Sequence, residues 1–197
     1  MPRKLTPRRQ ERLEQTLRQR QKDLCLVLAN IHDPHNVSAI YRSCDAFGVP
    51  LIHLYYTDTA FPQLSEKTSA SARKWVDSVR HASRDSLFTA LCASGQKTLA
   101  TSCSPAAKPV SAYDLTKPTA IIMGNEHSGV PEELLPLVDG EIYIPMYGMI
   151  QSFNVSVAAA LLLSEASRQR REAGMYDTML WTPDEYAERL AAWQEKA

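Results

Sequence analysis

Hydrophobic and polar positions change along the chain in short blocks, and these blocks predict strands that alternate with helices. Residues 24–29 (LCLVLA) are apolar at every position, which indicates a strand covered on both faces. Similar short runs predict the other strands, at residues 51–55, 76–79, 98–100, 120–123 and 141–144. Strands that alternate with helices imply the α/β class, with a mostly parallel sheet flanked by helices.

Apolar residues at helical spacing fill the intervals between these strands. Val37, Ile40, Tyr41 and Cys44 share one face of a predicted helix over 36–47, which Gly48 ends. The other predicted helices are residues 66–75, 84–94, a short segment after Pro131, and 153–172. Together with the strands, these helices form the predicted body of the protein, residues 23–172.

Both ends of the chain predict further helices outside this body. Thr6 and Pro7 supply an N-cap hydroxyl and a proline at the first helical position, so residues 1–22 hold a helix with a thin apolar stripe. Residues 173–197 repeat the capping signal at Thr182–Pro183 and carry Trp181 and Trp193. We expect this last segment to be an amphipathic helical extension that docks on the body or on a partner.

The charge of the chain is unevenly distributed, although the formal net charge is zero. Residues 1–22 hold eight basic residues against two acidic ones, which gives +6 and leaves −6 for the remainder. A basic arm on an acidic body is the pattern expected of a protein that touches a polyanion through the arm. The alternative is a solvated surface helix. Arg168, Arg170 and Arg171 form a second basic cluster.

Neither a membrane segment nor a disulfide framework is predicted. The longest apolar run, Val155–Leu163, is far too short to cross a bilayer, and no secretory signal is recognisable. The four cysteines are widely spaced and form no C-x-x-C pair, which indicates reduced thiols in a cytoplasmic protein.

Polar side chains follow three of the predicted strands, in segments 30–49, 124–135 and 145–154. The candidates are Asn36, Arg42, Glu126, Ser152 and Asn154. Because the carboxyl ends of parallel strands gather at one edge of a sheet, these residues are expected to share a cleft there. The segment 100–103 (ATSC) is small and polar enough to join them. Each residue also has a structural interpretation, as a helix cap or, for Arg42, as a surface ion pair.

Several common sites are disfavoured by the same segments. No G-x-G-x-x-G follows the first strand and no P-loop sequence occurs, so an ordinary dinucleotide or nucleotide site is not expected. His32 and His35 lie in a proline-containing loop without a thiolate pair, which is a weak metal signal. Ser152 is not in a G-x-S-x-G elbow, so a serine hydrolase is not indicated.

Three motifs resemble a known family in their order and content. HNVSAIYRSCDAFGV, IIMGNEHSGV and IPMYGMIQSFNVSVAAALLL are similar to the three motifs of the SPOUT RNA 2′-O-ribose methyltransferases. SASARKWVDSV (69–79) and the basic first helix resemble, within that family, the branch that methylates guanosine 18 in the D-loop of tRNA. The ribosomal RNA enzymes carry an additional N-terminal domain, and the wobble-ribose enzymes are shorter. His127 and Ser128 depart from the basic or bulkier pair common in relatives.

The resemblance implies a C-terminal deep trefoil knot, a homodimer and the cofactor S-adenosyl-L-methionine, with S-adenosyl-L-homocysteine as product. The helix 153–163 would contribute to the dimer, and Gly148 would let the backbone approach the adenine. The residues expected to line the cofactor pocket are Thr101, Gly124, Ile144, Met149 and Phe153. The residues expected to contact tRNA are Arg8, Arg9, Arg12, Arg18, Arg168 and Arg171.

The catalytic set implied by the resemblance is Arg42, Asn36, Glu126, Ser152 and Asn154. A guanidinium does not deprotonate in proteins, so Arg42 is expected to bind an RNA phosphate and stabilise charge on the attacking 2′-oxygen. The proton would leave to that phosphate or to water. Asn36 would orient Arg42 and the ribose, and Glu126 and Asn154 would fix the loops. The alternatives are another RNA site (a tRNA wobble ribose or rRNA), a catalytically silent RNA-binding protein and, more distantly, a nucleotide-dependent enzyme.

Overall fold

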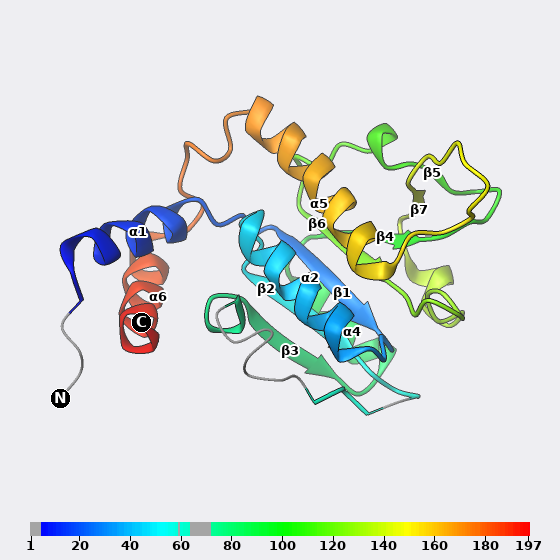
Figure 1. Cartoon of the computed structure of the whole chain (residues 1–197), viewed down its shortest axis with the longest axis horizontal. Coiled ribbons are helices and arrows are strands. Elements are labelled where there is room, and N and C mark those ends of the chain that lie inside the picture. The colour runs from blue at the N-terminus through cyan, green and yellow to red at the C-terminus, as the bar shows by residue number, and fades with distance from the viewer. Residues whose placement is uncertain (1–4, 59, 64–71) are drawn as a thin grey trace.

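A seven-stranded sheet forms the centre of the protein (Figure 1), in a computed structural model that describes residues 5–58, 60–63 and 72–197. The strand order is β3-β2-β1-β6-β4-β7-β5, and every neighbouring pair is parallel. The strands are β1 (Leu24–Ala29), β2 (Leu51–Tyr55), β3 (Asp77–His81), β4 (Lys97–Thr101), β5 (Lys108–Pro109), β6 (Thr119–Met123) and β7 (Gly140–Tyr143). The predicted α/β class and parallel sheet are confirmed.

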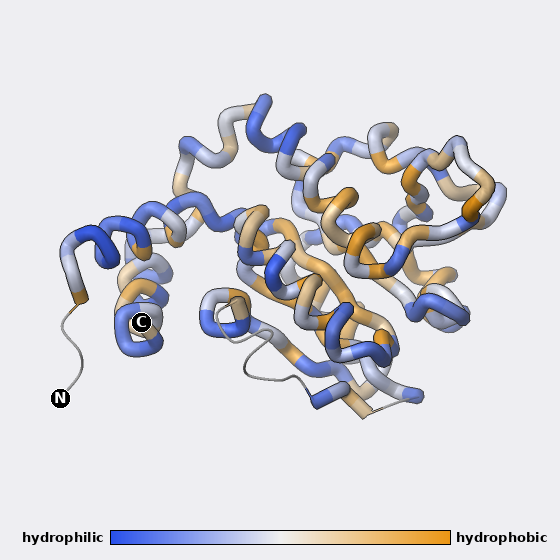
Figure 2. The backbone as a smooth tube through the Cα atoms, in the orientation of Figure 1, coloured by the Kyte–Doolittle hydropathy of each residue, from blue (hydrophilic) through white to orange (hydrophobic). Residues whose placement is uncertain are grey.

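Helices cover both faces of this sheet, as the two-sided burial of β1 requires. The helices are α1 (Pro7–Arg18), α2 (Pro34–Ala46), α4 (Arg84–Ala93), α5 (Val155–Glu172) and α6 (Pro183–Lys196). Leu26 and Leu28 of β1 belong to the core that α2 and α5 complete, whereas Val27 belongs to the core under α4. Figure 2 shows β1 as mostly hydrophobic and α1 as mostly hydrophilic. Within the described ranges, no helix is long and apolar enough to cross a membrane.

Some element boundaries differ from the expectation for identifiable reasons. The helix α2 begins at Pro34, because Asp33 accepts a hydrogen bond from the His35 backbone N–H and serves as the N-cap. The segment after Pro131 forms only a short 3₁₀ turn, η3 (Leu135–Leu137). The helix expected at 66–75 falls largely outside the described residues, and its described part is a 3₁₀ turn, η1 (Ala72–Lys74). The two-residue edge strand β5 and the turn η2 (Val110–Ala112) carry no apolar pattern that predicts them.

The two terminal helices pack against each other. Leu13 and Leu17 of α1 form a separate apolar cluster with Trp181 and Trp193, and the Trp181 indole N–H donates to the Leu17 carbonyl at 3.0 Å. The ring of Trp75 lies 5.1 Å from that of Trp193, which connects the pair to the body. The C-terminal extension therefore docks on the first helix and on the body of its own chain.

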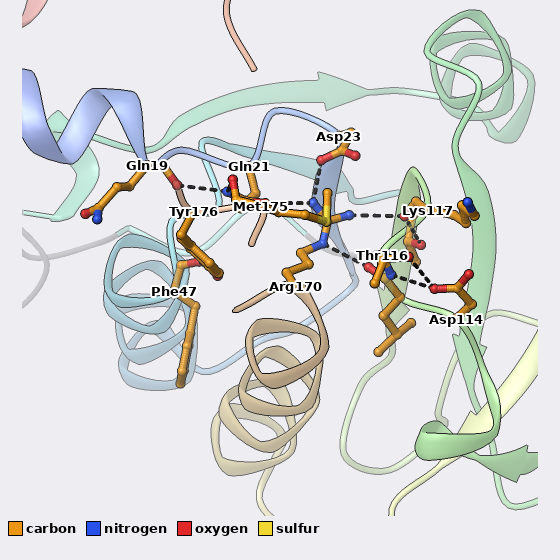
Figure 3. A network of polar contacts seen from close by, with 12 residues as sticks. Gln19, Gln21, Asp23, Phe47, Asp114, Thr116, Lys117, Arg170, Met175 and Tyr176 are labelled. Carbon is orange, nitrogen blue, oxygen red and sulfur yellow. Dashed lines mark hydrogen bonds and ion pairs between the residues drawn. The ribbon is translucent and has the colours of Figure 1, made fainter. Parts of the chain in front are cut away.

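One buried arginine ties the end of α5 to the start of the sheet (Figure 3). The Arg170 side chain is fully buried. Its guanidinium donates to the Asp23 carboxylate at 2.5 Å and to the carbonyls of Leu115 and Lys117 at 2.9 and 3.1 Å. Gln21 accepts a further bond at 3.1 Å. These acceptors precede β1 and β6, so Arg170 fixes α5 against the two central strands.

The predicted late basic cluster is therefore wrong for Arg170, which is a structural residue. Arg168 is also engaged, because Glu165 and Glu172 accept hydrogen bonds from its guanidinium at 2.8 and 2.7 Å. Arg171 stays exposed. In the N-terminal segment, Arg20 is likewise fully buried and pairs with Asp45, so it adds no charge to the surface of the basic arm.

Replacing Arg170 should therefore destabilise the fold strongly. In Arg170→Met, the Asp23 carboxylate and two carbonyls lose their donor inside the protein, and the free energy of unfolding should fall by about 3–5 kcal/mol. Urea denaturation measures this change. Arg171→Met, one residue along and exposed, is the matched control and should change it by no more than about 0.5 kcal/mol. Equal losses in the two variants would contradict the structural role of Arg170.

Candidate functional site

A cavity of about 970 Å³ lies at the carboxyl ends of β4, β6 and β7. It is bounded by the segments 101–104, 123–130, 142–144 and 150–153, and its floor includes Ala158 and Leu162 of α5. The carboxyl edge of a parallel sheet is where ligands bind in such folds, because the loops that follow neighbouring strands meet there. The expected cleft is present, and segment 101–103 joins it as predicted.

The loop after β6 is a tight turn that only glycines allow. Asn125 and Gly129 exchange backbone hydrogen bonds at 3.0 and 2.9 Å, so the chain folds back on itself within four residues. Gly129 has a φ of +71°, which L side chains rarely adopt. A Cβ on Gly124 would lie 2.1 Å from the carbonyl carbon of Gly129. The two glycines of the G-N-E-H-S-G motif are therefore required by the shape of the loop.

Three predicted catalytic residues from segments far apart in the chain are joined by hydrogen bonds through Asn36. The Asn36 side-chain amide donates to the Glu126 carboxylate at 2.5 Å, and the Asn36 carbonyl oxygen accepts from the Asn154 amide at 3.0 Å. Asn36 is only 9% exposed. Asn154 also caps α5, because its oxygen accepts from the Ser156 backbone N–H at 2.9 Å. The capping interpretation thus holds for Asn154 but fails for Asn36, whose α2 is capped by Asp33.

The remaining predicted residues divide between the cavity and the surface. Thr101, Gly124, Ile144, Phe153 and Ser152 line the cavity. Met149 does not line it and is 99% exposed. Arg42 is exposed on α2 and lies outside the lining, and its side chain makes no hydrogen bond or ion pair with any described residue. The surface ion pair considered for Arg42 is therefore not seen in the described part of the chain.

Sequence reasoning missed several residues that shape the site. Asn30 follows β1 with a φ of +51°, and its carbonyl accepts a hydrogen bond from the Asn125 side chain at 3.0 Å. On the other side of the cavity, Ser104 donates to the Glu141 carboxylate at 2.8 Å. Hydrogen bonds from Ser102 and Ser104 lower the pKa of Glu141, which keeps that carboxylate ionised beside the cavity. An asparagine directly after a strand was the one available signal for Asn30, because asparagine tolerates positive φ.

The histidines do not gather into a metal site. Among the described residues, no group of three or more histidine, cysteine, aspartate or glutamate side chains is placed to hold a metal ion. His32 and His35 are exposed. His53 and His81 instead lie on neighbouring strands with ring nitrogens 2.8 Å apart. Burial, together with the nearby His81, lowers the pKa of His53 to about 4, so it stays neutral in the sheet.

Residues 23–164, which carry all three loops, match the SpoU rRNA Methylase family. The chain belongs to this family. It is 45% identical over 194 residues to a Thermus thermophilus protein named tRNA (guanosine(18)-2'-O)-methyltransferase, with 98% of this chain and 100% of that protein covered. The resemblance read from the three motifs is confirmed.

Solved SpoU structures show the same fold. The crystal structure of the A. aeolicus TrmH/SpoU tRNA modifying enzyme is similar with a TM-score of 0.88 and 37% identity, and 95% of each chain is covered. The SpoU methyltransferase AviRb from Streptomyces viridochromogenes, solved in complex with the cofactor AdoMet (S-adenosylmethionine), has a TM-score of 0.68 and 27% identity, with 77% of this chain and 62% of that chain covered.

The cavity suits S-adenosylmethionine in this SpoU protein. Its volume of about 970 Å³ is at the upper end of the range for small-molecule sites. Its walls combine apolar side chains such as Ile142 and Leu162 with the polar edge of Ser102 and Gln151. An adenine ring requires the apolar part, and a ribose and an amino-acid group require the polar part. The residues present therefore fit the family's cofactor.

Substitution of Gly124 should distort the cavity. A Cβ at this position would clash with backbone atoms of Gly129 and Val130, which cannot move aside as the end of a flexible side chain could. Gly124→Ala should lower the free energy of unfolding by about 3 kcal/mol, the upper range for overpacking. Gly148→Ala is the matched control, since a Cβ there meets nothing within 4 Å and its φ is not positive. Chemical denaturation should find a change within about 0.5 kcal/mol for that control. A stable Gly124→Ala protein would refute the tight-turn description.

Proposed function

We propose that this protein transfers a methyl group from S-adenosylmethionine to the ribose 2′-hydroxyl of guanosine 18 in the D-loop of tRNA. The observation that carries the proposal is the hydrogen-bonded set of Asn36, Glu126 and Asn154 beside a cavity that fits the cofactor. The relative named for guanosine 18 supports the choice of substrate, because the similarity covers its full length. The methyl-transfer chemistry itself is common to the family.

Thr101, Gly124, Ile144 and Phe153 would hold the cofactor, which supplies an activated methyl group when bound. The Thr101 hydroxyl donates to the Ile122 carbonyl at 3.2 Å, and this hydrogen bond fixes the orientation of the Thr101 side chain in the cavity wall. Ser152 lines the cavity and has a hydroxyl for hydrogen bonding there. Met149 lies outside the cavity lining with an exposed side chain, so it is not assigned to the cofactor in this proposal.

The protein has to align the reacting oxygen and help to remove one proton. Arg42 would bind the RNA phosphate next to the ribose and stabilise negative charge on the 2′-oxygen, since guanidinium remains protonated. Asn36 is a positioning residue, because its carbonyl and one of its two amide N–H groups already bind Asn154 and Glu126. The second N–H would remain for an oxygen of the ribose, and the second lone pair of the Asn36 carbonyl would remain to accept from Arg42, whose guanidinium can only donate. The proton would pass to the phosphate or to water.

A homodimer completes the proposed enzyme. Large apolar side chains are exposed on the loop before α5 and on α5 itself; they are Tyr147, Met149, Ile150, Val157 and Leu161. Burial of such a surface against a second copy would remove it from water. Arg42 is exposed on α2, which packs against α5, so the same association would place it near the interface.

The trefoil knot implied by the family is also proposed for this chain. Thr101 at the end of β4 and Lys108 at the start of β5 both register with Ile142, on opposite sides of β7. Residues 102–107 therefore cross from one side of β7 to the other at its carboxyl end. If the chain after β7 passes through the loop formed by residues 102–107, the backbone is knotted. That loop would also hold the cavity wall in place.

The proposed tRNA surface begins at α1, where Arg8, Arg9, Arg12 and Arg18 are exposed on a helix whose apolar face is covered by α6. Exposed arginines on a fixed helix suit a phosphate backbone. Arg171 would add to this surface, while Arg168 would first have to leave its two glutamates. All four cysteines are free thiols, which supports the cytoplasm as the compartment.

Transfer of labelled methyl groups from S-adenosylmethionine to a tRNA transcript tests this function directly. The transcript should accept the label on one ribose, and a transcript with guanosine 18 replaced by adenosine should accept none. Equal labelling of both transcripts would show that another nucleotide is methylated. Binding without any transfer would establish the silent RNA-binding alternative.

Arg42→Ala should lower kcat by about 10²–10³-fold, the usual loss when one donor to developing negative charge is removed. The Kd for S-adenosylmethionine, measured by calorimetry, should stay within about twofold, because Arg42 does not line the cavity. Arg84→Ala is the control, since Arg84 lies on α4 at the opposite face of the sheet. Unchanged turnover in Arg42→Ala would remove Arg42 from the mechanism.

A further inference from the structure

Exposed arginines continue beyond α1, onto the face of the body that carries α2. Arg73 lies in η1 and Arg80 lies in β3, and both side chains are exposed. Neither belongs to the three sequence motifs or to the cavity lining. Within the described ranges, neither forms a salt bridge. Contacts of their neighbours place Arg73 between the terminal helices and α2, and Arg80 on the same face.

The turn η1 connects the terminal helices to α2. On one side, Lys74 donates to the Lys196 carbonyl at the end of α6 at 3.0 Å, and Trp75 stacks edge-on against Trp193. On the other side, Ala72 belongs to the same core cluster as Ile40 and Tyr41 of α2. Arg73, between these anchors, therefore lies where the α1–α6 pair meets α2.

Arg80 is held on the same face by aromatic contacts. Its guanidinium carbon lies 4.8 Å from the centre of the Phe61 ring, and Phe61 packs edge-on against Tyr56 at 5.2 Å. Such stacking orients a guanidinium and leaves its N–H groups for a ligand. Burial raises the pKa of Tyr41, and its Ser78 hydrogen bond and the positive charges of Arg73 and Arg80 oppose that rise. In the strand register Arg80 lies opposite Leu54, which belongs to the same core cluster as Tyr41, the residue before Arg42.

Three arginines therefore occupy one face: Arg73 next to the terminal helices, Arg80 on the edge strand and Arg42 on α2. Asp77, an acidic neighbour in β3, is paired with Arg189 of α6 and does not compensate them. Guanidinium groups that have no ion-pair partner among the described residues attract a polyanion, and their placement on three elements favours an extended one.

We infer that Arg73 and Arg80 bind backbone phosphates of the tRNA and continue the surface of α1 to Arg42. This inference rests on the proposed function, because it takes tRNA as the substrate. The contacts would be independent of base sequence, as phosphate contacts are, and would set the register in which the D-loop reaches Arg42. Both residues are positioning residues, since they touch the substrate away from the reacting atoms.

The test measures tRNA affinity against salt concentration for Arg73→Gln, Arg80→Gln and the double variant, by filter binding of a transcript. At 0.1 M salt each single variant should weaken the Kd by about fivefold to tenfold, and the slope of log K against log salt should shrink by about one per lost contact. In methyl transfer, KM for tRNA should rise while kcat stays within about twofold.

Charge-conserving and distant variants complete the experiment. Arg73→Lys and Arg80→Lys should keep the wild-type slope, because each retains one phosphate-binding charge. Arg84→Gln on α4 should leave affinity and slope unchanged, and Arg8→Gln in α1 should lower the slope as a positive reference. If the double variant keeps the wild-type slope, the inference is overturned. A loss of affinity shared equally by the lysine and glutamine variants, with no change in slope, would also overturn it, since it would point to packing alone.

Binding is read independently of catalysis, so the two proposals fail separately. A wild-type protein that transfers methyl groups while the double variant binds normally would refute only this inference. A wild-type protein that binds tRNA with the expected salt dependence but transfers nothing would refute only the proposed function.

Discussion

The site depends on one pair of hydrogen bonds, from Asn36 to Glu126 and from Asn154 to Asn36. Asn36 lies in the first turn of α2, Glu126 in the loop after β6, and Asn154 at the N-cap of α5, so the hydrogen bonds join three segments that follow three different strands. A nearly buried amide whose partner is removed keeps the full cost of desolvation, about 1–3 kcal/mol. The loops are therefore held in one arrangement, and that arrangement defines one wall of the cavity.

Other contacts make this arrangement possible without taking part in it. Gly124 and Gly129 turn the second loop tightly enough to bring Glu126 toward α2, and Asn125 ties the same loop to Asn30. At the far end of α5, Arg170 fixes the helix that Asn154 begins. A helix held at both ends is a rigid support, and a site on rigid elements retains its geometry when substrate binds.

Sequence reasoning was most successful where a local pattern has one structural cause. Continuous apolar runs identified β1 and β6, and the positions of Asn36, Glu126 and Asn154 after strands predicted their convergence. It failed where the burial or the role of a residue depends on partners that are distant in the sequence. Nothing local distinguishes Arg170 from Arg171, because burial of the former is decided by Asp23 and Gln21, far away in the chain. Likewise, Asp33 rather than Asn36 caps α2, since Pro34 begins the helix two residues before the start that the apolar spacing indicates.

A double-mutant cycle between Asn36 and Asn154 tests the central claim most directly. Asn36→Ala removes one partner, and Asn154→Ser removes the amide donor while keeping a residue that caps α5. The free energy of S-adenosylmethionine binding, measured by calorimetry, should show a coupling of about 1 kcal/mol or more, so that the double variant loses less than the sum of the singles. If the two losses simply add, the hydrogen bonds between the loops do not hold the cavity together.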